Sequence, residues 1–386
     1  MNALVVGGNS GIGLSIVCEL IKRNFQKIYV VGKEEIDLDI VDNSIRGELC
    51  QKVIFYKKNF INEDFSIFEE INDINALFIT VGFGRVALFE DLTEIEIQNL
   101  LKVNLEAVVM ILKHYYNKIN SSDDFYTSVM VSICSRIVSP FFSVYSAAKS
   151  GLRFFIEAIN IELNAKGLKN RILEVSPGSI KGTSFNGEKT NITQINNFSK
   201  EVISRTLNRD ELFIPSYDEV YKNVLERYFE DPIEFGLNSY QYKKESGRVS
   251  SKPQVVIGYL SGTFDLFHIG HLKLLERAKG ECDYLIVSVH ESGAWKGKET
   301  FIPYEERKAI VQSIKYVDEV VNDFIEDVDA WEIYKYNKLF VGSDYKGTER
   351  FNRYENMLKG KAEIVYFPYT QGTSSTQLRE RLKNKD

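Results

Sequence analysis

The chain has 386 residues, of which 44% are hydrophobic and 26% are charged, and its formal net charge is −6 at pH 7. This length exceeds that of one typical domain, so we expect two domains that each bury their own core. The acidic balance argues against a nucleic-acid-binding protein, and no apolar run approaches the ~20 residues that cross a bilayer. Four cysteines without paired spacing are typical of a reducing compartment. We therefore expect a cytoplasmic protein without nucleic-acid or membrane partners.

A glycine-rich turn follows the first predicted strand. The apolar segment Met1 to Val6 is predicted to form a strand, and Leu14 to Ile21 has helical periodicity. Between them lie Gly7, Gly8, Asn9, Ser10, Gly11, Ile12 and Gly13. Glycines permit a tight turn and close approach of a ligand, and the next helix N-terminus favours a pyrophosphate. We interpret this segment as a dinucleotide-binding turn. Its G-x-x-x-G-x-G spacing differs from the standard G-x-G-x-x-G, so a simple loop is the alternative.

Tyr145 and Lys149 lie four residues apart on a helix predicted to run to about Leu163. They share one face, so the ammonium can favour the phenolate and lower the tyrosine pKa from about 10. The spacing alone is weak evidence, because Tyr334 and Lys338 also satisfy it. The order of segments is more informative: the glycine turn, Lys102-Val103-Asn104 in a long helix, Ser132 to Ser135 at a strand end, Tyr145 with Lys149, and Ser176 to Thr183.

This succession resembles the short-chain dehydrogenase/reductase family over roughly residues 1 to 240. The resemblance implies that Tyr145 protonates the substrate carbonyl, that Lys149 binds the nicotinamide ribose and tunes Tyr145, and that Asn104 holds a water of the proton relay. A serine polarises the carbonyl; the strand-end pattern favours Ser135, while the usual spacing of thirteen residues before the tyrosine fits Ser132. The implied cofactor contacts are Gly7, Asn9, Ser10, Gly11, Ile12, Gly13, Pro177, Gly178, Ile180 and Thr183.

The cofactor is predicted to be NADP, with NAD as the alternative. The second predicted strand, Lys27 to Val31, is followed by Gly32-Lys33-Glu34, without the acidic residue that would bind a ribose 2′-hydroxyl. Lys33 could instead meet a 2′-phosphate. The chain departs from the family in carrying Thr80-Val81-Gly82 in place of Asn-Asn-Ala-Gly, and Asn59 in place of the aspartate that borders the adenine.

The segment from Asn186 to Lys252 contains no motif, and we expect it to determine substrate choice. Helices are predicted over Asn191 to Asn208 and Tyr217 to Phe229. The small, polar residues 246–253 are predicted to form a linker between a domain over residues 1–245 and a domain over residues 254–386.

Two histidines mark the start of a helix in the second domain. Val255 to Leu260 is predicted to be a buried strand and Leu272 to Ala278 a helix, so His268 and His271 lie where the helix begins. Imidazoles at a helix N-terminus can donate to phosphate oxygens as a phosphoanhydride bond breaks, and Gly270 permits close approach. A metal site is the alternative, but no further Cys or His close in sequence completes a zinc set.

From about Val255 the chain resembles the glycerol-3-phosphate cytidylyltransferase family of the H-x-G-H superfamily. The blocks are Gly262-Thr263-Phe264-Asp265, His268 with His271, Lys296 with Lys298, Tyr304 to Arg307, Tyr316 to Val320, Gly342-Ser343-Asp344 and Gly372 to Thr376. The resemblance implies CTP and an alcohol phosphate as substrates, Mg²⁺, and release of pyrophosphate. The implied catalytic residues are His268, His271, Lys296 and Arg307, and the implied nucleotide contacts are Gly262, Thr263, Phe264, His268, His271, Lys298, Asp344, Ser374, Ser375 and Thr376. One departure is Tyr369-Thr370-Gln371-Gly372, where relatives carry Arg-Thr-Glu-Gly.

The predicted fold is therefore α/β, with two Rossmann-like, doubly wound parallel-sheet domains in tandem. We predict a bifunctional enzyme that makes a CDP-activated polyol, a precursor of surface polymers. One domain reduces a ketose or aldose phosphate with NAD(P)H, and the other transfers a cytidylyl group to the polyol phosphate. Transfer before reduction is one alternative. Another is a cytidylyl- or adenylyltransferase regulated by a non-catalytic dinucleotide-binding domain. A homodimer or higher homo-oligomer is expected.

Overall fold

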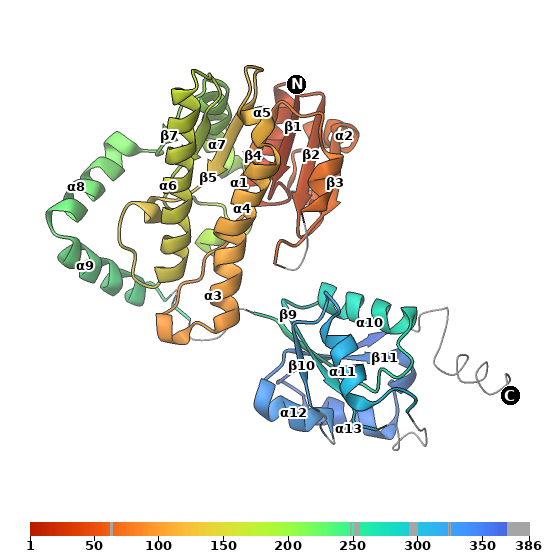
Figure 1. Cartoon of the computed structure of the whole chain (residues 1–386). Coiled ribbons are helices and arrows are strands. Elements are labelled where there is room, and N and C mark those ends of the chain that lie inside the picture. Colours follow the sequence, from red (N-terminus) through yellow and green to blue (C-terminus); the bar gives the residue numbers. More distant parts are fainter. Residues whose placement is uncertain are drawn as a thin grey trace. The chain divides into compact units, whose positions relative to one another are not determined.

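The computed structural model describes residues 1–61, 65–247, 249–250, 255–292, 300–322, 324 and 326–368. The chain forms two compact units, residues 1–253 and 254–386 (Figure 1). Each unit contains a sheet whose strands are all parallel, together with packed helices. The predicted α/β class, with two Rossmann-like domains in tandem, is confirmed.

The sheet of the first unit has seven strands in the order β3-β2-β1-β4-β5-β6-β7. Their bounds are β1 (Asn2–Val6), β2 (Lys27–Gly32), β3 (Val53–Lys57), β4 (Ala76–Ile79), β5 (Tyr126–Met130), β6 (Ile172–Val175) and β7 (Leu212–Phe213). The chain adds strands on one side of β1 and then crosses to β4 on the other side. The carboxyl ends of β1 and β4 therefore border the crevice in which such sheets bind ligands.

Helices cover both faces of this sheet (Figure 1). They are α1 (Gly11–Lys22), α2 (Asn43–Lys52), α3 (Glu94–Leu101), α4 (Ala107–His114), α5 (Tyr116–Ile119), α6 (Ser143–Ala165), α7 (Ile192–Leu207), α8 (Lys222–Glu230) and α9 (Pro232–Glu245). Successive residues of β1 enter different apolar clusters: Leu4 packs with Ile111 and Leu152, whereas Val5 packs with Ile16 and Val202. Burial on both faces explains why the strand sequences are almost continuously apolar.

Several short turns of other helical types interrupt these elements. The 3₁₀ turns are η1 (Leu38–Ile40), η2 (Ser66–Glu70), η3 (Phe89–Asp91), η5 (Ile133–Ser135) and η6 (Ser184–Asn186), and the π turns are η4 (Lys102–Glu106) and η7 (Tyr217–Tyr221). The long helix predicted around Asn104 is therefore broken by η4 into α3 and α4. The helix predicted from Tyr217 begins as η7 and continues as α8.

The second unit has five strands in the order β10-β9-β8-β11-β12. The strands are β8 (Ile257–Gly262), β9 (Tyr284–Val289), β10 (Glu319–Val321), β11 (Lys338–Gly342) and β12 (Glu363–Phe367). The helical segments are α10 (Ile269–Gly280), α11 (Tyr304–Gln312), α12 (Asp327–Tyr334), α13 (Glu349–Met357) and the 3₁₀ turn η9 (Ser343–Tyr345). Strand order reverses between β8 and β11, which places a second ligand crevice at their carboxyl ends.

The segment after α9 is attached to the first unit. The Ser250 N–H donates to the Val86 carbonyl at 3.1 Å, and the Arg85 guanidinium donates to the Ser250 carbonyl at 3.1 Å. Arg85 also forms a buried ion pair with Glu96 at 2.6 Å. The described part of the predicted linker is therefore held by backbone and side-chain hydrogen bonds.

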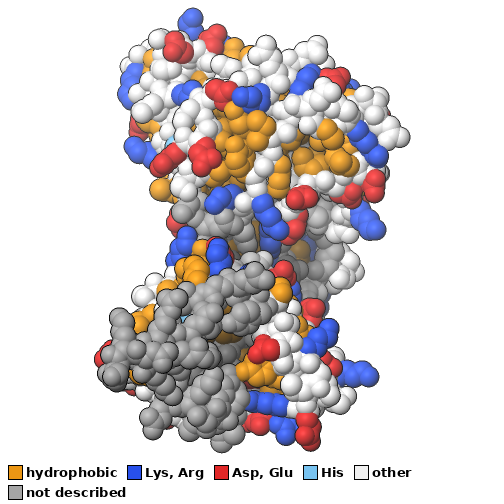
Figure 2. Space-filling model, turned by 90° about the vertical axis from the view of Figure 1, so that its right-hand side faces the viewer, with side chains coloured by type: hydrophobic (Ala, Val, Ile, Leu, Met, Phe, Trp, Pro, Cys, Tyr) orange, Lys and Arg blue, Asp and Glu red, His pale blue; other side chains and the backbone are white. Residues whose placement is uncertain are grey.

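The apolar character of the helices and the charge of the surface relate to the predicted absence of membrane and nucleic-acid partners. In the described part of the chain, no helix combines the length and the apolar character that crossing a membrane requires. Figure 2 shows one face on which the visible Lys and Arg side chains are interspersed with Asp and Glu side chains. The described residues visible on this face therefore do not form a continuous stripe of positive charge of the kind that nucleic-acid-binding surfaces use.

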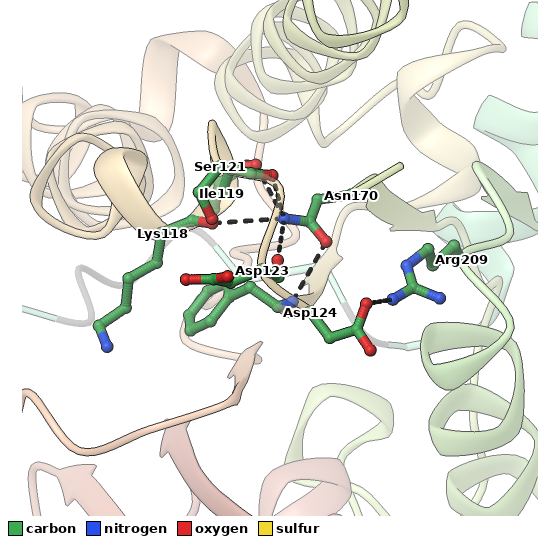
Figure 3. Close-up of polar contacts among 8 residues, drawn as sticks. Lys118, Ile119, Ser121, Asp123, Asp124, Asn170 and Arg209 are labelled. Carbon is green, nitrogen blue, oxygen red and sulfur yellow. Dashed lines mark hydrogen bonds and ion pairs between the residues drawn. The ribbon is translucent and has the colours of Figure 1, made fainter. Parts of the chain in front are cut away.

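The Asn170 side chain forms hydrogen bonds with the loop that precedes β5, at the end of the sheet opposite the crevice (Figure 3). Its amide nitrogen contacts the carbonyls of Lys118, Ile119, Ser121 and Asp123 at 2.8 to 3.3 Å. Its carbonyl oxygen accepts from the Phe125 N–H at 3.1 Å. The two amide hydrogens of Asn170 are shared among four backbone carbonyls of this loop, which lies outside the sheet. The side chain therefore supplies hydrogen bonds that a neighbouring strand would otherwise supply.

Replacing Asn170 with alanine is expected to destabilise the first unit by about 1–3 kcal/mol, because buried backbone groups lose their partner. Thermal unfolding followed by calorimetry should show its midpoint falling by about 2–4 °C for each kcal/mol. The matched control is Asn197→Ala, at an exposed position on α7. Equal midpoints for the two variants would contradict the role of Asn170.

Candidate active sites

The glycine turn of the first unit lies at the carboxyl end of β1. Gly7 has φ +85° and Gly11 has φ +51°, a region that favours glycine. A Cβ on Gly13 would lie 2.1 Å from the Gly7 carbonyl oxygen, and one on Gly7 would lie 2.8 Å from the Thr80 hydroxyl oxygen. The turn thus packs against Thr80, one of the residues that departs from the family pattern. A Cβ on Gly11 would meet no atom within 4 Å, so the space beside the start of α1 is open.

Two polar side chains lie close to this turn. The N–H of Gly11, at the N-terminus of α1, donates to the Thr190 hydroxyl at 3.1 Å. A Cβ on Gly32 would lie 2.3 Å from the Asn9 Oδ1, so the Asn9 side chain covers the end of β2, where Lys33 follows. Thr190 was not among the predicted site residues, because no sequence signal distinguishes it. The remaining donors of the helix N-terminus, the open space at Gly11 and the nearby Lys33 fit a dinucleotide phosphate.

Asn104 holds the segment that follows β4. Its Nδ2 donates to the carbonyls of Phe83 at 2.8 Å and Leu100 at 3.0 Å, and its Oδ1 accepts from the Phe83 N–H at 3.2 Å. Asn104 lies in the π turn η4, and Leu100 lies at the end of the preceding helix α3. The side chain is fully buried and bonded to backbone, so it positions Gly82 and Phe83.

Tyr145 and Lys149 lie together on α6, both nearly fully buried. The Lys149 Nζ donates to the Met130 carbonyl at 2.8 Å and lies 5.8 Å from the centroid of the Tyr145 ring. Burial lowers the pKa of Lys149 to about 7. Burial also raises the pKa of Tyr145; the Cys134 thiol adds to this increase, and a hydrogen bond with Ser132 opposes it.

The lowered tyrosine pKa that the spacing predicts is therefore not what this structure shows. The physical reason is that burial acts on both groups and the ammonium turns to the Met130 carbonyl. Burial penalises the charged form of each residue, which moves the two pKa values apart, downward for Lys149 and upward for Tyr145. Proton transfer from Tyr145 would need an added charge or hydrogen bond that keeps Lys149 protonated.

The two candidate serines are placed differently. Ser132 caps the turn η5, accepting from the Cys134 N–H at 3.2 Å, and its hydroxyl also interacts with Tyr145. The Ser135 hydroxyl is buried and has no hydrogen-bond partner among the described atoms, whereas its carbonyl accepts from the Ser150 hydroxyl at 3.2 Å. This geometry favours Ser132, the alternative that the spacing of thirteen residues before Tyr145 offered, over Ser135.

Residues predicted to cover the cofactor lie beyond β6. The Pro177 carbonyl accepts from the Ile133 N–H at 2.9 Å, which ties this segment to the turn that follows Ser132. The Thr183 hydroxyl donates to the Ile180 carbonyl at 2.7 Å, and Gly178 lies against the Tyr221 hydroxyl. These contacts place the segment next to the serines and Tyr145.

His268 and His271 cap the first turn of α10 in the second unit. The Nδ1 of His268 accepts from the Gly270 N–H at 3.0 Å, and the Nδ1 of His271 contacts the His268 N–H at 3.4 Å. The two rings stack with centroids 4.0 Å apart. Burial lowers the pKa of His268, which favours its neutral form. A neutral imidazole whose Nδ1 accepts carries its proton on Nε2, so the Nε2 of His268 is a hydrogen-bond donor.

Aromatic rings support this histidine pair from one side. The rings of Phe264 and Phe267 each lie 5.4 Å from that of His271. Phe264 and Leu266 have φ +52° and +49°, an uncommon conformation outside glycine. A Cβ on Gly262 would lie 3.0 Å from the Phe264 ring, so glycine lets the ring turn inward. The strained loop therefore fixes the position of the imidazoles.

Arg307 joins the loops that surround the pair. Its guanidinium is completely buried and donates to four backbone carbonyls at 2.5 to 2.9 Å, those of Thr263, His290, Glu291 and Ile302. These contacts show that Arg307 positions the loops after β8 and β9; its predicted catalytic role stays a prediction. Asp265 adds a contact, accepting from the N–H groups of Phe301 and Ile302 at 3.0 to 3.2 Å.

The other predicted residues of this site are only partly visible. Asp344 lies exposed in η9, directly after β11 and thus at the crevice. Lys296, Lys298, Ser374, Ser375, Thr376 and the departure at 369–372 lie outside the described residues. Among the residues that are described, no three or more His, Cys, Asp or Glu side chains are grouped to hold a metal ion.

Comparisons with known proteins find a family match for each of the two units. The family model for short chain dehydrogenase matches residues 1–193, and that for cytidylyltransferase-like proteins matches residues 259–381. The chain is 42% identical over 125 residues to glycerol-3-phosphate cytidylyltransferase from Bacillus subtilis, covering 31% of this chain and 92% of that protein. It is 37% identical over 129 residues to the enzyme of the same name from Staphylococcus aureus, covering 32% of this chain and 93% of that protein.

A solved short-chain dehydrogenase from Streptomyces avermitilis is also similar, with 15% identity and a TM-score of 0.48 over 64% of this chain and 98% of that chain. The match of the family model to half of the chain and the coverage of the curated relatives determine the family of each unit. The chain therefore belongs to the short-chain dehydrogenase family in its N-terminal half and to the glycerol-3-phosphate cytidylyltransferase family in its C-terminal third, and it is an enzyme with an oxidoreductase domain and a cytidylyltransferase domain.

Proposed function

We propose that the chain makes a CDP-activated polyol in two steps. The reductase unit converts a ketose or aldose phosphate to a polyol phosphate, and the transferase unit joins this product to CTP with release of pyrophosphate. The observation that carries the proposal is the union, on one chain, of a reductase site with a site whose relatives are named for transfer to glycerol 3-phosphate. Reduction first is favoured, because it gives the transferase an acceptor like that of these relatives.

In the reductase unit, bound NAD(P)H would supply the hydride. Tyr145 donates a proton to the carbonyl oxygen, and Ser132 hydrogen bonds the same oxygen. Lys149, once protonated, stabilises the phenolate that remains. Asn104 supports this arrangement, since a Cβ on Gly82 would lie 2.7 Å from the Asn104 Oδ1 and 3.3 Å from the Lys149 Nζ. A water held at Asn104 as part of a proton relay also remains part of the proposal.

The dinucleotide is proposed to be NADP. Its pyrophosphate would lie at the start of α1, over Gly7, Gly11 and Gly13, and its 2′-phosphate would meet Lys33, which is exposed directly after β2. Pro177, Gly178, Ile180 and Thr183 would cover the nicotinamide. Self-association as a homodimer or larger homo-oligomer stays a prediction; exposed apolar side chains on α4 and α6, namely Met110, Phe154 and Ile161, are consistent with it.

In the transferase unit, a phosphate oxygen of the acceptor attacks the α-phosphorus of CTP in line with the leaving pyrophosphate. Such a step depends on positioning and charge stabilisation rather than on a covalent enzyme group. The Nε2–H groups of His268 and His271 would donate to the phosphates, with Lys296, Lys298 and the hydroxyls of residues 374–376 adding contacts. Asp344 would lie beside the nucleoside. Mg²⁺ would be held mainly by triphosphate oxygens, because it keeps several waters and takes few protein ligands.

The central test incubates the full chain with CTP, NADPH or NADH, and a panel of ketose and aldose phosphates, following NADPH oxidation and pyrophosphate separately. We expect NADPH oxidation with one substrate and pyrophosphate release only after reduction. Tyr145→Phe should abolish the first signal and keep transfer to the ready-made polyol phosphate. Pyrophosphate release from the ketose phosphate without NADPH would overturn the order, and equal use of NADH would contradict the NADP preference. Unchanged NADPH oxidation in Tyr145→Phe would contradict the catalytic role of Tyr145. Absence of NADPH oxidation with every carbonyl compound of the panel would favour a non-catalytic, regulatory reductase unit.

The serine assignment is tested with a pair of variants. Ser132→Ala should lower the kcat of NADPH oxidation by about 10²–10³-fold, the usual loss when a donor to a developing oxyanion is removed. Ser135→Ala should stay within about 2-fold of the original chain, since its hydroxyl has no partner to lose among the described atoms. The reverse pattern would restore Ser135 to the catalytic role.

The double role of His268 can be separated by two substitutions. His268→Ala removes the helix cap and the phosphate donor, whereas His268→Asn keeps a side-chain oxygen suited to capping. Both should lose pyrophosphate release by about 10²-fold or more. Only the alanine variant should lower the unfolding midpoint of the second unit, through a cap worth about 0.5–2 kcal/mol. Pyrophosphate release at the original rate in His268→Asn would exclude a direct catalytic role.

The pKa of Lys149 predicts a proton uptake on cofactor binding. With a pKa of about 7, the buried ammonium is largely deprotonated at pH 8, and contact with an anionic dinucleotide favours its charged form. NADP binding should therefore take up protons at pH 8, and its affinity should fall as pH rises from 7 to 9. Calorimetry in buffers of different ionisation enthalpy measures this uptake, which Lys149→Met should abolish. No uptake in the unsubstituted chain would contradict the assignment.

A further inference from the structure

A helical arm follows the last strand of the reductase unit. It consists of residues 217–245 and contains η7, α8 and α9, which extend beside α6 in Figure 1. Neither α8 nor α9 has a buried residue, so the arm contributes little to the core. Its attachment must therefore come from particular contacts rather than from general burial.

The arm docks on the segment that links the serines to Tyr145. The ring of Tyr240 stacks on that of Phe141 with centroids 4.7 Å apart. The Lys243 Nζ donates to the Ser139 hydroxyl at 2.6 Å and to the Pro140 carbonyl at 2.9 Å. Residues 139–141 connect η5, which Ser132 caps, with α6, which carries Tyr145. The arm is thus fixed to the backbone that holds the catalytic groups.

One side chain of the arm reaches the reductase site itself. A Cβ on Gly178 would lie 1.5 Å from the Tyr221 hydroxyl oxygen and 2.6 Å from its Cζ, so Tyr221 occupies the space that only glycine leaves at position 178. The Cys134 thiol is close enough to raise the pKa of both Tyr221 and Tyr145. Tyr221 is partly buried, whereas Tyr217, which begins the same π turn, is exposed.

The phenol of Tyr221 is neutral at this position. Burial raises the pKa of Tyr221, and the Cys134 thiol adds to this increase, so the phenol keeps its proton at neutral pH and can donate a hydrogen bond. A phenol and a thiol suit an uncharged hydroxyl better than a phosphate, which would call for cationic partners.

We propose that Tyr221 is a substrate-positioning residue of the reductase, whose hydroxyl donates to a hydroxyl group of the polyhydroxy carbonyl substrate, with Cys134 bordering the same pocket wall. The arm 217–245 thereby determines which carbonyl compound is accepted. The inference rests on the proposed reduction of a sugar phosphate and adds the residue that recognises its hydroxyl chain. Sequence reasoning could not find this residue, because Tyr221 lies 76 positions from Tyr145 in a segment without motifs.

The test uses Tyr221→Phe in the full chain, which keeps the ring and removes only the hydroxyl. The KM for the carbonyl substrate should rise about 2- to 12-fold, the range for loss of one neutral hydrogen bond. The Kd for NADPH should not change. The rate of pyrophosphate release from CTP and the ready-made polyol phosphate should not change either. Tyr217→Phe is the matched control, since it removes the same atom at an exposed position of the same turn, and it should leave KM unchanged.

Substrate analogues that lack single hydroxyl groups provide a second readout that a purely structural role would not move. One deoxy analogue should raise KM in the unsubstituted chain by the same factor as Tyr221→Phe, and the variant should not distinguish it from the parent substrate. An unchanged KM in Tyr221→Phe, or equal losses for every analogue in both proteins, would overturn this inference alone. If none of the carbonyl compounds tested supports NADPH oxidation by the unsubstituted chain, the proposed function itself fails.

Discussion

The reversal of strand order at the centre of each sheet is the constraint on which both sites depend. In the first unit the chain passes from β1 into a glycine turn while β4 runs beside it, and in the second unit the same relation holds between β8 and β11. Neighbouring crossovers leave in opposite directions at these points, so backbone donors and helix N-termini face an open edge. The glycine turn and the His268 turn are two solutions to the same geometry.

The two sites differ in how they treat charge. In the transferase unit, burial lowers the pKa of His268, and the Nδ1 of each imidazole contacts a backbone N–H of the first turn, which orients both rings. In the reductase unit, Lys149 is buried and donates to a backbone carbonyl, and burial lowers its pKa to about 7. Because this pKa is close to neutral pH, the protonation state of Lys149 changes readily when a charged ligand binds in the crevice. The first site is preorganised, and the second depends on its ligand for its protonation state.

Local patterns allowed the sequence to predict the parts of these sites that depend on local structure. The glycine turn, the shared face of Tyr145 and Lys149, and the histidines at a helix start follow from strand and helix periodicity. The tertiary environment was not predictable in this way. The direction of the Tyr145 pKa depends on burial, which no spacing reveals, and the choice between Ser132 and Ser135 depends on the short turn η5. The backbone contacts of Arg307 were likewise not predictable, because an arginine in a sequence does not show which carbonyls its guanidinium will meet.

The contact between Arg85 and Ser250 has a consequence for separating the two units as individual proteins. Cutting the chain at the end of α9 would remove the Ser250 carbonyl and leave a donor of a buried guanidinium without its partner. Such a loss costs about 1–3 kcal/mol, a large share of the stability of an ordinary domain. A reductase fragment that extends to residue 253 keeps this bond, so the boundary for expressing the isolated unit lies several residues beyond its last helix.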